Sequence, residues 1–458
     1  MLAVAPLFLF PYCGEVWTAR VVLWFSLLAG VWVLMEPSRR AGEMMHDARR
    51  RVAVGLLRDP LFWFMLALTA FAAVRVFNDG VAMTYDAEKG LWNLADAAFA
   101  FLPGSVRDGG GLAFAVAVAA TVVIAGCRHA LGRSARMAYL LASSLLAGVA
   151  ALIAAVLCTS GQARVLETAA CRYLDPSFAG VAFGVHFLSS IVAIVGMFEH
   201  GWKRSMPLAL IATGGTAIGL FTFAPLPIVL VFVCGGVLVL LQSLAYVGVK
   251  VGGLAIPKSL ILFSIALLLP VLFVIGVMPA EIREARLSFF TEGRLFPEDF
   301  ESLRGVLSSI AHKAWDNHPW IGTGLGSFAL DIRFNAAEAD WAVLPPGQVG
   351  ALNGWWQLLA ERGIAGGVLL VAPLLFLFWT YGVRLAAAIP AVPRNGVSDV
   401  IYPMGLLGLV AVAACAVCGF VDRSFCRPDA LLAVAATVAL AGSSLPAVKR
   451  SSAEEMES

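Results

Sequence analysis

The sequence predicts an all-α fold: a polytopic membrane helix bundle of about twelve transmembrane helices, with one large loop outside the bilayer that contains short helices. Of its 458 residues, 60% are hydrophobic and 14% are charged, and the mean hydropathy is +0.86. Soluble domains carry about 25% charged residues and about 45–50% apolar ones. The apolar residues also come in long uninterrupted runs, which a soluble core does not require.

Each apolar run predicts a helix, because about 20 apolar residues in helical form cross a bilayer and an open sheet edge cannot lie in lipid. A β-barrel would instead show alternating polar and apolar residues. Pro225 and Pro227 separate two of the runs, so these form either one kinked helix or a tight hairpin. The predicted spans are residues 2–13 (short), 17–35, 60–76, 111–128, 138–158, 178–197, 206–223, 226–246, 258–278, 363–384, 400–420 and 429–446.

The distribution of Lys and Arg predicts how the bundle is oriented. The short connections on one side hold 17 of the 32 basic residues, whereas the short connections on the other side hold 6. Cytoplasmic loops of membrane proteins are enriched in Lys and Arg. Both termini are therefore predicted to be cytoplasmic. No basic leader precedes the first apolar run, so a cleavable signal is not expected.

Charge and cysteine content exclude several classes of function. The net charge of +2 does not suit a broad nucleic-acid-binding surface. Cys415 and Cys418 lie within an apolar run and are interpreted as buried small hydrophobic residues. Cys171 and Cys426 fall in predicted outer loops, where oxidation is possible, and the sequence does not establish whether they pair. We expect no cofactor, no metal site and no nucleic-acid partner.

The chain divides into four parts. Residues 1–278 are predicted to hold the first nine spans, and residues 363–446 the last three. Residues 447–458 form a polar tail on the cytoplasmic side. Between the ninth and tenth spans lies a loop of 84 residues, 279–362, which holds 18 of the 62 charged side chains. A loop of this length is typically functional or forms its own small fold.

The first part of this loop, residues 297–317, has the pattern of an amphipathic helix. Apolar residues recur at spacings of three and four, and Arg304, Ser308 and Lys313 occupy the polar face. The sequence predicts that this helix lies on the membrane surface with its apolar face toward the lipid. The apolar positions are Phe300, Leu303, Leu307, Ile310, Ala311 and Ala314.

Two further motifs follow in the same loop. His318-Pro319 precedes Gly322, Gly324 and Gly326, which allow tight turns and close approach of a ligand; a compact turn that closes the loop against the bundle is the alternative. The second motif runs from Asn353 to Gly363 and contains Trp355, Trp356, Gln357 and Glu361. The tryptophans suit either an interfacial belt or a surface on which a sugar stacks.

Together these motifs resemble the O-antigen ligase and O-antigen polymerase superfamily. The matching pattern is Arg304 fourteen residues before His318, the Gly-x-Gly-x-Gly segment, and Asn-x-x-x-Gln-Leu-Leu-x-Glu-x-Gly from Asn353 to Gly363. The resemblance is specific over about residues 300–390. It implies a bacterial inner-membrane protein of about twelve spans, with both termini in the cytoplasm and a large periplasmic loop late in the chain.

The resemblance also implies a chemistry. Family members transfer a glycan from an undecaprenyl-diphosphate carrier to a sugar or protein acceptor, as metal-independent glycosyltransferases of the GT-C type or a related type. Arginine guanidinium groups suit the diphosphate leaving group, and a His or a carboxylate suits removal of the acceptor proton. The expected partners are the lipid-linked glycan, its lipid or protein acceptor and membrane lipids.

The chain departs from the family pattern at two positions. Leu352 stands where relatives carry the His that is favoured as the catalytic base, and Pro225 stands near the place of a second arginine. The candidate catalytic residues are therefore Arg304, on the diphosphate, with His318 and Glu361 as possible bases. Glu361 has Arg362 beside it, which is a possible ion-pair partner. The candidate substrate-binding residues are Arg294, Gly322, Gly324, Gly326, Asn353, Trp355, Trp356 and Gln357.

Two other functions fit the same sequence. One is a non-catalytic member of the family, which binds a lipid-linked glycan or scaffolds polysaccharide export. The other is a secondary transporter or flippase. Inverted repeats are not evident, and few ionisable residues other than His186 lie deep within a predicted span, whereas coupled transporters usually need several.

Overall fold

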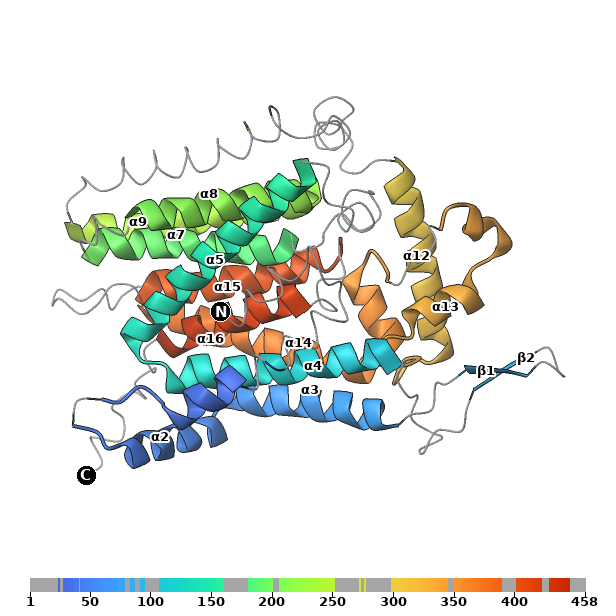
Figure 1. Cartoon of the computed structure of the whole chain (residues 1–458), viewed down its shortest axis with the longest axis horizontal. Coiled ribbons are helices and arrows are strands. Elements are labelled where there is room, and N and C mark those ends of the chain that lie inside the picture. Colours follow the sequence, from blue (N-terminus) through green and yellow to red (C-terminus); the bar gives the residue numbers. More distant parts are fainter. Residues whose placement is uncertain are drawn as a thin grey trace.

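A computed structural model of the chain shows a bundle of long helices with a smaller helical unit at one end (Figure 1). The structure describes residues 24, 28–40, 42–78, 83–86, 91–94, 107–159, 180–200, 206–251, 272, 276, 298–344, 350–388, 401–421 and 428–444. The predicted spans 2–13 and 258–278, the tail 447–458, Arg294, Cys171 and Cys426 lie wholly or almost wholly outside these residues.

Apart from one short hairpin, the regular secondary structure of the described residues is helical. In the hairpin, β1 (Met83–Asp86) pairs antiparallel with β2 (Leu91–Leu94), with Met83 opposite Leu94. The sequence did not predict these strands. The helices are α2 (Met45–Leu57), α3 (Pro60–Phe77), α4 (Arg107–Ala125) with the π-helical turn η1 (Gly126–Ala130), α5 (Arg133–Thr159), α7 (Gly180–His200), α8 (Met206–Phe223), α9 (Leu226–Val251), α12 (Glu298–Asn317), α13 (Phe328–Asn335), the 3-10 turn η3 (Glu338–Ala342), α14 (Gly354–Ala388), α15 (Ile401–Cys418) and α16 (Pro428–Ser444).

Four of the described helices are long and apolar enough to cross a membrane. The spans that they offer are Pro60–Phe77, Gly110–Ala130, Ala138–Val156 and Gly354–Val383. Shorter apolar stretches occur in α7, α8, α9, α15 and α16. Large apolar side chains on the outside of the bundle, such as Leu375 and Trp379 of α14, are exposed, as expected of helices that face lipid. The predictions of a helical fold and of helices that could span a membrane are confirmed, with four such helices among the described residues.

The chain between α8 and α9 forms a hairpin. Phe183 of α7 stacks on Phe223 at the end of α8, and Ile194 packs with Ala209 near its start, so α7 and α8 are antiparallel. Gly184 and Gly236 show that α7 runs parallel to α9, because Gly184 lies against Phe232 and Gly236 lies against Ile191. The helices α8 and α9 therefore run in opposite directions, and of the two predicted alternatives at Pro225 the hairpin is correct.

Small residues allow the central helices to approach closely. A Cβ atom added to Gly215 of α8 would lie 2.5 Å from the carbonyl oxygen of Gly148 in α5, and one added to Gly219 would lie 2.7 Å from Ala151. Packing of this kind is typical of helices in membranes, where lipid supplies no hydrophobic drive and van der Waals contact holds helices together.

The two ends of the bundle are built differently. At one end, the Gly354 amide at the start of α14 donates to the Gly419 carbonyl beyond α15, 2.7 Å away. The helices α12 and α13 lie at this end of the bundle (Figure 1). At the other end, Asp59 before α3 binds Arg128 and His129 of η1, at 2.6 and 2.8 Å. The predicted loop 279–362 thus contributes helices at the end where α3 finishes and α14 begins.

One prediction about this loop is wrong. The helix α12 forms as expected, but its apolar face does not lie on a membrane surface. Its apolar residues are buried in a small core with Phe328 and Ile332 of α13 and with Leu352 and Ala360 near the start of α14. Periodicity shows only that one face needs covering, and here the protein itself covers that face.

Candidate functional site

The glycine-rich segment forms a tight turn against α14. Gly322, Gly324 and Gly326 have φ of 70°, 138° and 71°, which are left-handed conformations that favour glycine. A Cβ atom on Gly322 would lie 2.4 Å from the carbonyl carbon of Glu361. The close approach is therefore to the protein's own backbone, so the compact-turn interpretation is correct for Gly322.

The same turn fills a break in α14. Gly363 has φ 62° and ψ −168°, so helical hydrogen bonding stops there. The loop supplies replacements: the amides of Thr323 and Gly324 donate to the carbonyls of Ala360 and Glu361, at 2.8 and 3.2 Å. After the break, the amides of Ile364 and Ala365 donate to Pro319 and Trp320, at 2.9 and 3.0 Å. Buried backbone groups thereby keep their partners.

Arg75, near the end of α3, binds both the glycine-rich turn and α14 at its break. We call the place where these three segments meet (Arg75, residues 318–327 and residues 360–365) the junction. Its side chain is 0% exposed, and Nη1 donates to the carbonyls of Ile321 and Glu361, at 2.8 and 2.9 Å. The guanidinium group also lies 5.3 Å from the centre of the Phe71 ring. Sequence reasoning missed this residue, because an arginine at the edge of a span normally reaches toward the interface.

Two buried carboxyl groups lie beside the junction. The side chain of Asp331 in α13 is 6% exposed, and its Oδ2 is 2.8 Å from the hydroxyl of Thr323 and 3.2 Å from that of Ser327. Glu361 is 4% exposed, and its Oε1 accepts a hydrogen bond from Gln357 Nε2, at 2.9 Å. The described contacts of Glu361 do not include the ion pair with Arg362 that the sequence suggested.

The environment of Asp331 changes its acidity. Burial raises the pKa of its carboxyl group from 3.8 to about 7; the hydrogen bonds from Thr323 and Ser327 oppose this rise, and the nearby charge of Glu361 adds to it. A carboxyl group with a pKa near neutrality can accept and release a proton at the pH of a cell. Asp331 was not among the sequence candidates, since nothing in the spacing of an isolated Asp reveals its burial.

The residues at the start of α14 hold the helix in place. Asn353 Oδ1 accepts hydrogen bonds from the amides of Trp355 and Trp356, at 3.1 and 3.2 Å, which caps the helix. Trp355 Nε1 donates to the Ala416 carbonyl of α15, at 3.0 Å. Trp356 stacks on His312 of α12, with ring centres 5.0 Å apart. Both tryptophans therefore pack between helices, whereas Gln357 binds Glu361 within α14.

The two remaining sequence candidates, Arg304 and His318, have their described hydrogen bonds with other groups. Arg304 is partly exposed on α12, and its Nη2 donates to the Phe420 carbonyl, at 2.7 Å. The side chain of His318 is exposed and contacts neither Asp331 nor Glu361. Within the described residues, no group of three or more His, Cys, Asp or Glu side chains could hold a metal ion.

No model of a protein family matches the chain, and no curated protein matches it either. The observations that bear on function are therefore the motifs of the sequence and the geometry of this junction.

Proposed function

We propose that the protein is a membrane glycosyltransferase of the ligase or polymerase type, which transfers a glycan from an undecaprenyl-diphosphate carrier to a sugar or protein acceptor. The proposal places it in a bacterial inner membrane with about twelve spans, cytoplasmic termini and residues 279–362 in the periplasm. Its chief support is Asp331, a buried carboxyl group with a pKa of about 7. This group is hydrogen-bonded to Thr323 and Ser327 of the glycine-rich segment.

In the proposed reaction, Asp331 takes the part of the histidine that Leu352 replaces. The acceptor hydroxyl attacks the anomeric carbon of the glycan, and its proton passes to the Asp331 carboxylate. The bond between that carbon and the diphosphate oxygen breaks, and the carrier leaves as a lipid diphosphate. Arg304 is assigned to the diphosphate on the strength of its place in the motif, and its partly exposed guanidinium group suits a surface contact.

Complementation of a ligase-null strain and a polymerase-null strain tests the proposal. The full-length chain should restore the glycan ladder on a gel in one of the two strains, and Asp331→Asn should reduce transfer at least about 100-fold, the contribution typical of a general base. Arg304→Ala should also abolish transfer. Arg333→Ala is the matched control, because Arg333 is an exposed residue of α13, and it should leave the ladder intact at equal protein abundance.

The non-catalytic alternative has one observation in its favour. Leu352, in the position of the expected histidine, is 2% exposed and packs in the small core, so that position holds no proton acceptor. Restoration of neither strain, together with capture of a lipid-linked glycan by the purified protein, would support this alternative. Equal activity of the wild type and Asp331→Asn would remove Asp331 from the reaction.

A further inference from the structure

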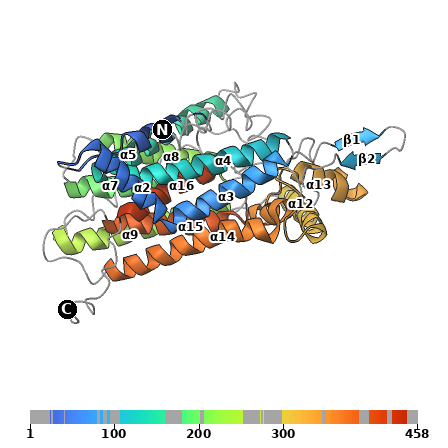
Figure 2. The same cartoon turned by 90° about the horizontal axis from the view of Figure 1, so that it is seen from below.

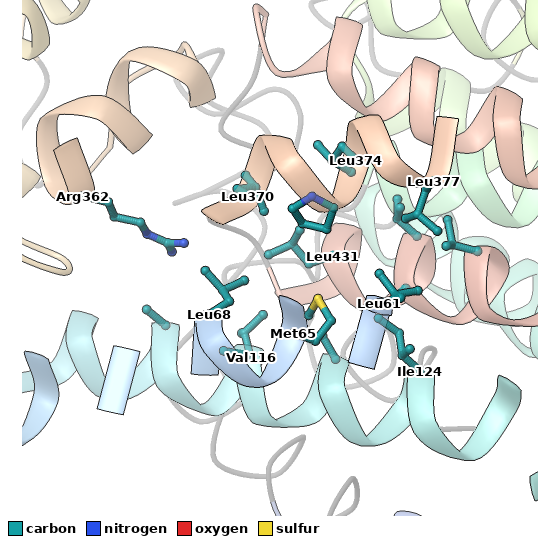
Figure 3. A pocket seen from close by; sticks show the side chains of 17 residues that line it. Leu61, Met65, Leu68, Val116, Ile124, Arg362, Leu370, Leu374, Leu377 and Leu431 are labelled. Carbon is teal, nitrogen blue, oxygen red and sulfur yellow. The ribbon is translucent and has the colours of Figure 1, made fainter. Parts of the chain in front are cut away.

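An apolar cavity lies among four helices of the bundle. Its walls come from α3, α4, α14 and α16, and include Leu61, Met65, Val116, Leu370, Leu374 and Leu431 (Figure 3). The empty space inside it, together with the open space at its mouth, is about 770 Å³. Sites for small ligands are mostly apolar with few polar groups. This cavity therefore has the lining of a ligand site.

One charged residue lies at one end of the cavity. Of the 17 side chains that line it, Arg362 alone is charged or polar, and Figure 3 shows its side chain extending toward Leu68 and Leu370. Arg362 is 8% exposed, and its buried Nε has no hydrogen-bond partner within the described residues. Glu361, the adjacent acid, points its carboxylate to Gln357 instead. A buried guanidinium nitrogen without a hydrogen-bond partner is costly, so the site is suited to an anion.

The surroundings of the cavity indicate where that anion comes from. Its outer walls, α3 and α14, are the least buried of the four candidate spans, and α3 lies between α4 and α14 (Figure 2). Both helices expose large apolar side chains, among them Trp63 and Leu375. A ligand that reaches the cavity through this side arrives from the lipid phase.

We infer that the cavity binds one hydrocarbon chain of an anionic membrane lipid, with the acid group of that lipid held by Arg362. The hydrocarbon chain packs against the apolar side chains that line the cavity. The planar guanidinium group pairs with a phosphate or carboxylate. The inference does not depend on glycan transfer, because lipid binding can be measured without an acceptor.

Binding of oleyl phosphate to the purified full-length protein in a neutral detergent tests the inference. Native mass spectrometry and thermal unfolding should show a bound oleyl phosphate and a raised apparent Tm. Oleyl alcohol, with the same chain and no charge, should bind at least about tenfold more weakly, and inorganic phosphate alone should leave the Tm unchanged. Equal effects of oleyl phosphate and oleyl alcohol, or protection by inorganic phosphate alone, would overturn the inference.

Two pairs of variants locate the site. Arg362→Gln should weaken oleyl phosphate binding at least about tenfold, a loss of about 1.4 kcal/mol, whereas Arg333→Gln should not. Ala113→Leu, which adds volume to the cavity wall, should block the hydrocarbon chain, whereas Ala138→Leu on the exposed side of α5 should not. If Arg362→Gln does not fold, the alanine pair decides alone. Unchanged binding in Ala113→Leu contradicts the inference, even where glycan transfer proceeds normally.

Discussion

Asp331 illustrates how the position of one side chain determines its chemistry. An exposed aspartate is ionised at neutral pH, but here burial beside Glu361 raises the pKa of the carboxyl group to about 7. The two hydroxyl groups around Oδ2 stabilise the ionised form without restoring the ordinary pKa. The residue therefore exchanges a proton within the physiological range, which is the property that the proposed reaction needs.

This perturbed pKa makes stability depend on pH. The folded state binds the Asp331 proton more tightly than the unfolded state does, so stability falls as the pH rises from about 4 to about 7. Over that range the loss from this one group is on the order of a few kcal/mol. We expect the apparent Tm of the wild type to fall between pH 4 and pH 8, and Asp331→Asn to show a shallower fall.

Glu301→Gln serves as the control for this experiment, because Glu301 is an exposed carboxylate of α12. The control variant should keep the pH dependence of the wild type. An identical slope in the wild type and Asp331→Asn would show that the Asp331 carboxyl group titrates at an ordinary pKa.

Sequence reasoning finds elements better than it finds such residues. Hydropathy located the described spans, because apolar runs report burial in lipid directly. The contacts of Arg75 could not be found in this way, since its two acceptors, Ile321 and Glu361, lie 246 and 286 positions away in the chain. Asp331 was missed for the same reason: its burial depends on the glycine turn and on α14, and neither is encoded in its local pattern.

At the scale of elements, the break in α14 depends on the glycine turn that fills it. The sequence placed the boundary between the loop and the tenth span at 362/363, which is where the helical geometry is interrupted. The sequence did not show that the helix begins earlier, at Gly354. The polar residues within the stretch from Asn353 to Arg362 gave it the character of a loop. The polar residues of this stretch, Asn353, Gln357, Glu361 and Arg362, are nevertheless buried, because other parts of the protein pack around them.

The close contact of the turn with α14 predicts the effect of a single methyl group. Gly322→Ala should lower stability by more than about 1–3 kcal/mol, because it adds backbone strain and a clash with the backbone at Glu361. Gly305→Ala in α12 is the control: a Cβ there meets open space within a helix, so stability should rise by up to about 1 kcal/mol. Thermal unfolding of both variants in detergent measures the difference. Similar stabilities in the two would contradict the packing of the turn.

At the scale of the whole molecule, the two ends of the bundle carry different structures. The small core of α12 and α13 lies at one end, and α2 lies at the other (Figure 1). The bias of Lys and Arg predicts that the α2 end faces the cytoplasm. The proposed reaction needs the α12 end to face the compartment in which the acceptor lies.

Labelling of single cysteines from outside intact cells tests this orientation. Glu301→Cys in α12 and Asp47→Cys in α2 both occupy exposed positions, so a membrane-impermeant maleimide can reach either one once it is on the same side of the membrane. We expect Glu301→Cys to react in intact cells whose outer membrane is permeable to the reagent, and Asp47→Cys to react only after the inner membrane is opened. The background should carry Cys171→Ser and Cys426→Ser, because the sequence places both cysteines on the outer side. The reverse pattern of labelling would place the carboxyl pair at the cytoplasmic end, where a periplasmic acceptor could not reach Asp331, and transfer at the periplasmic face would then be excluded.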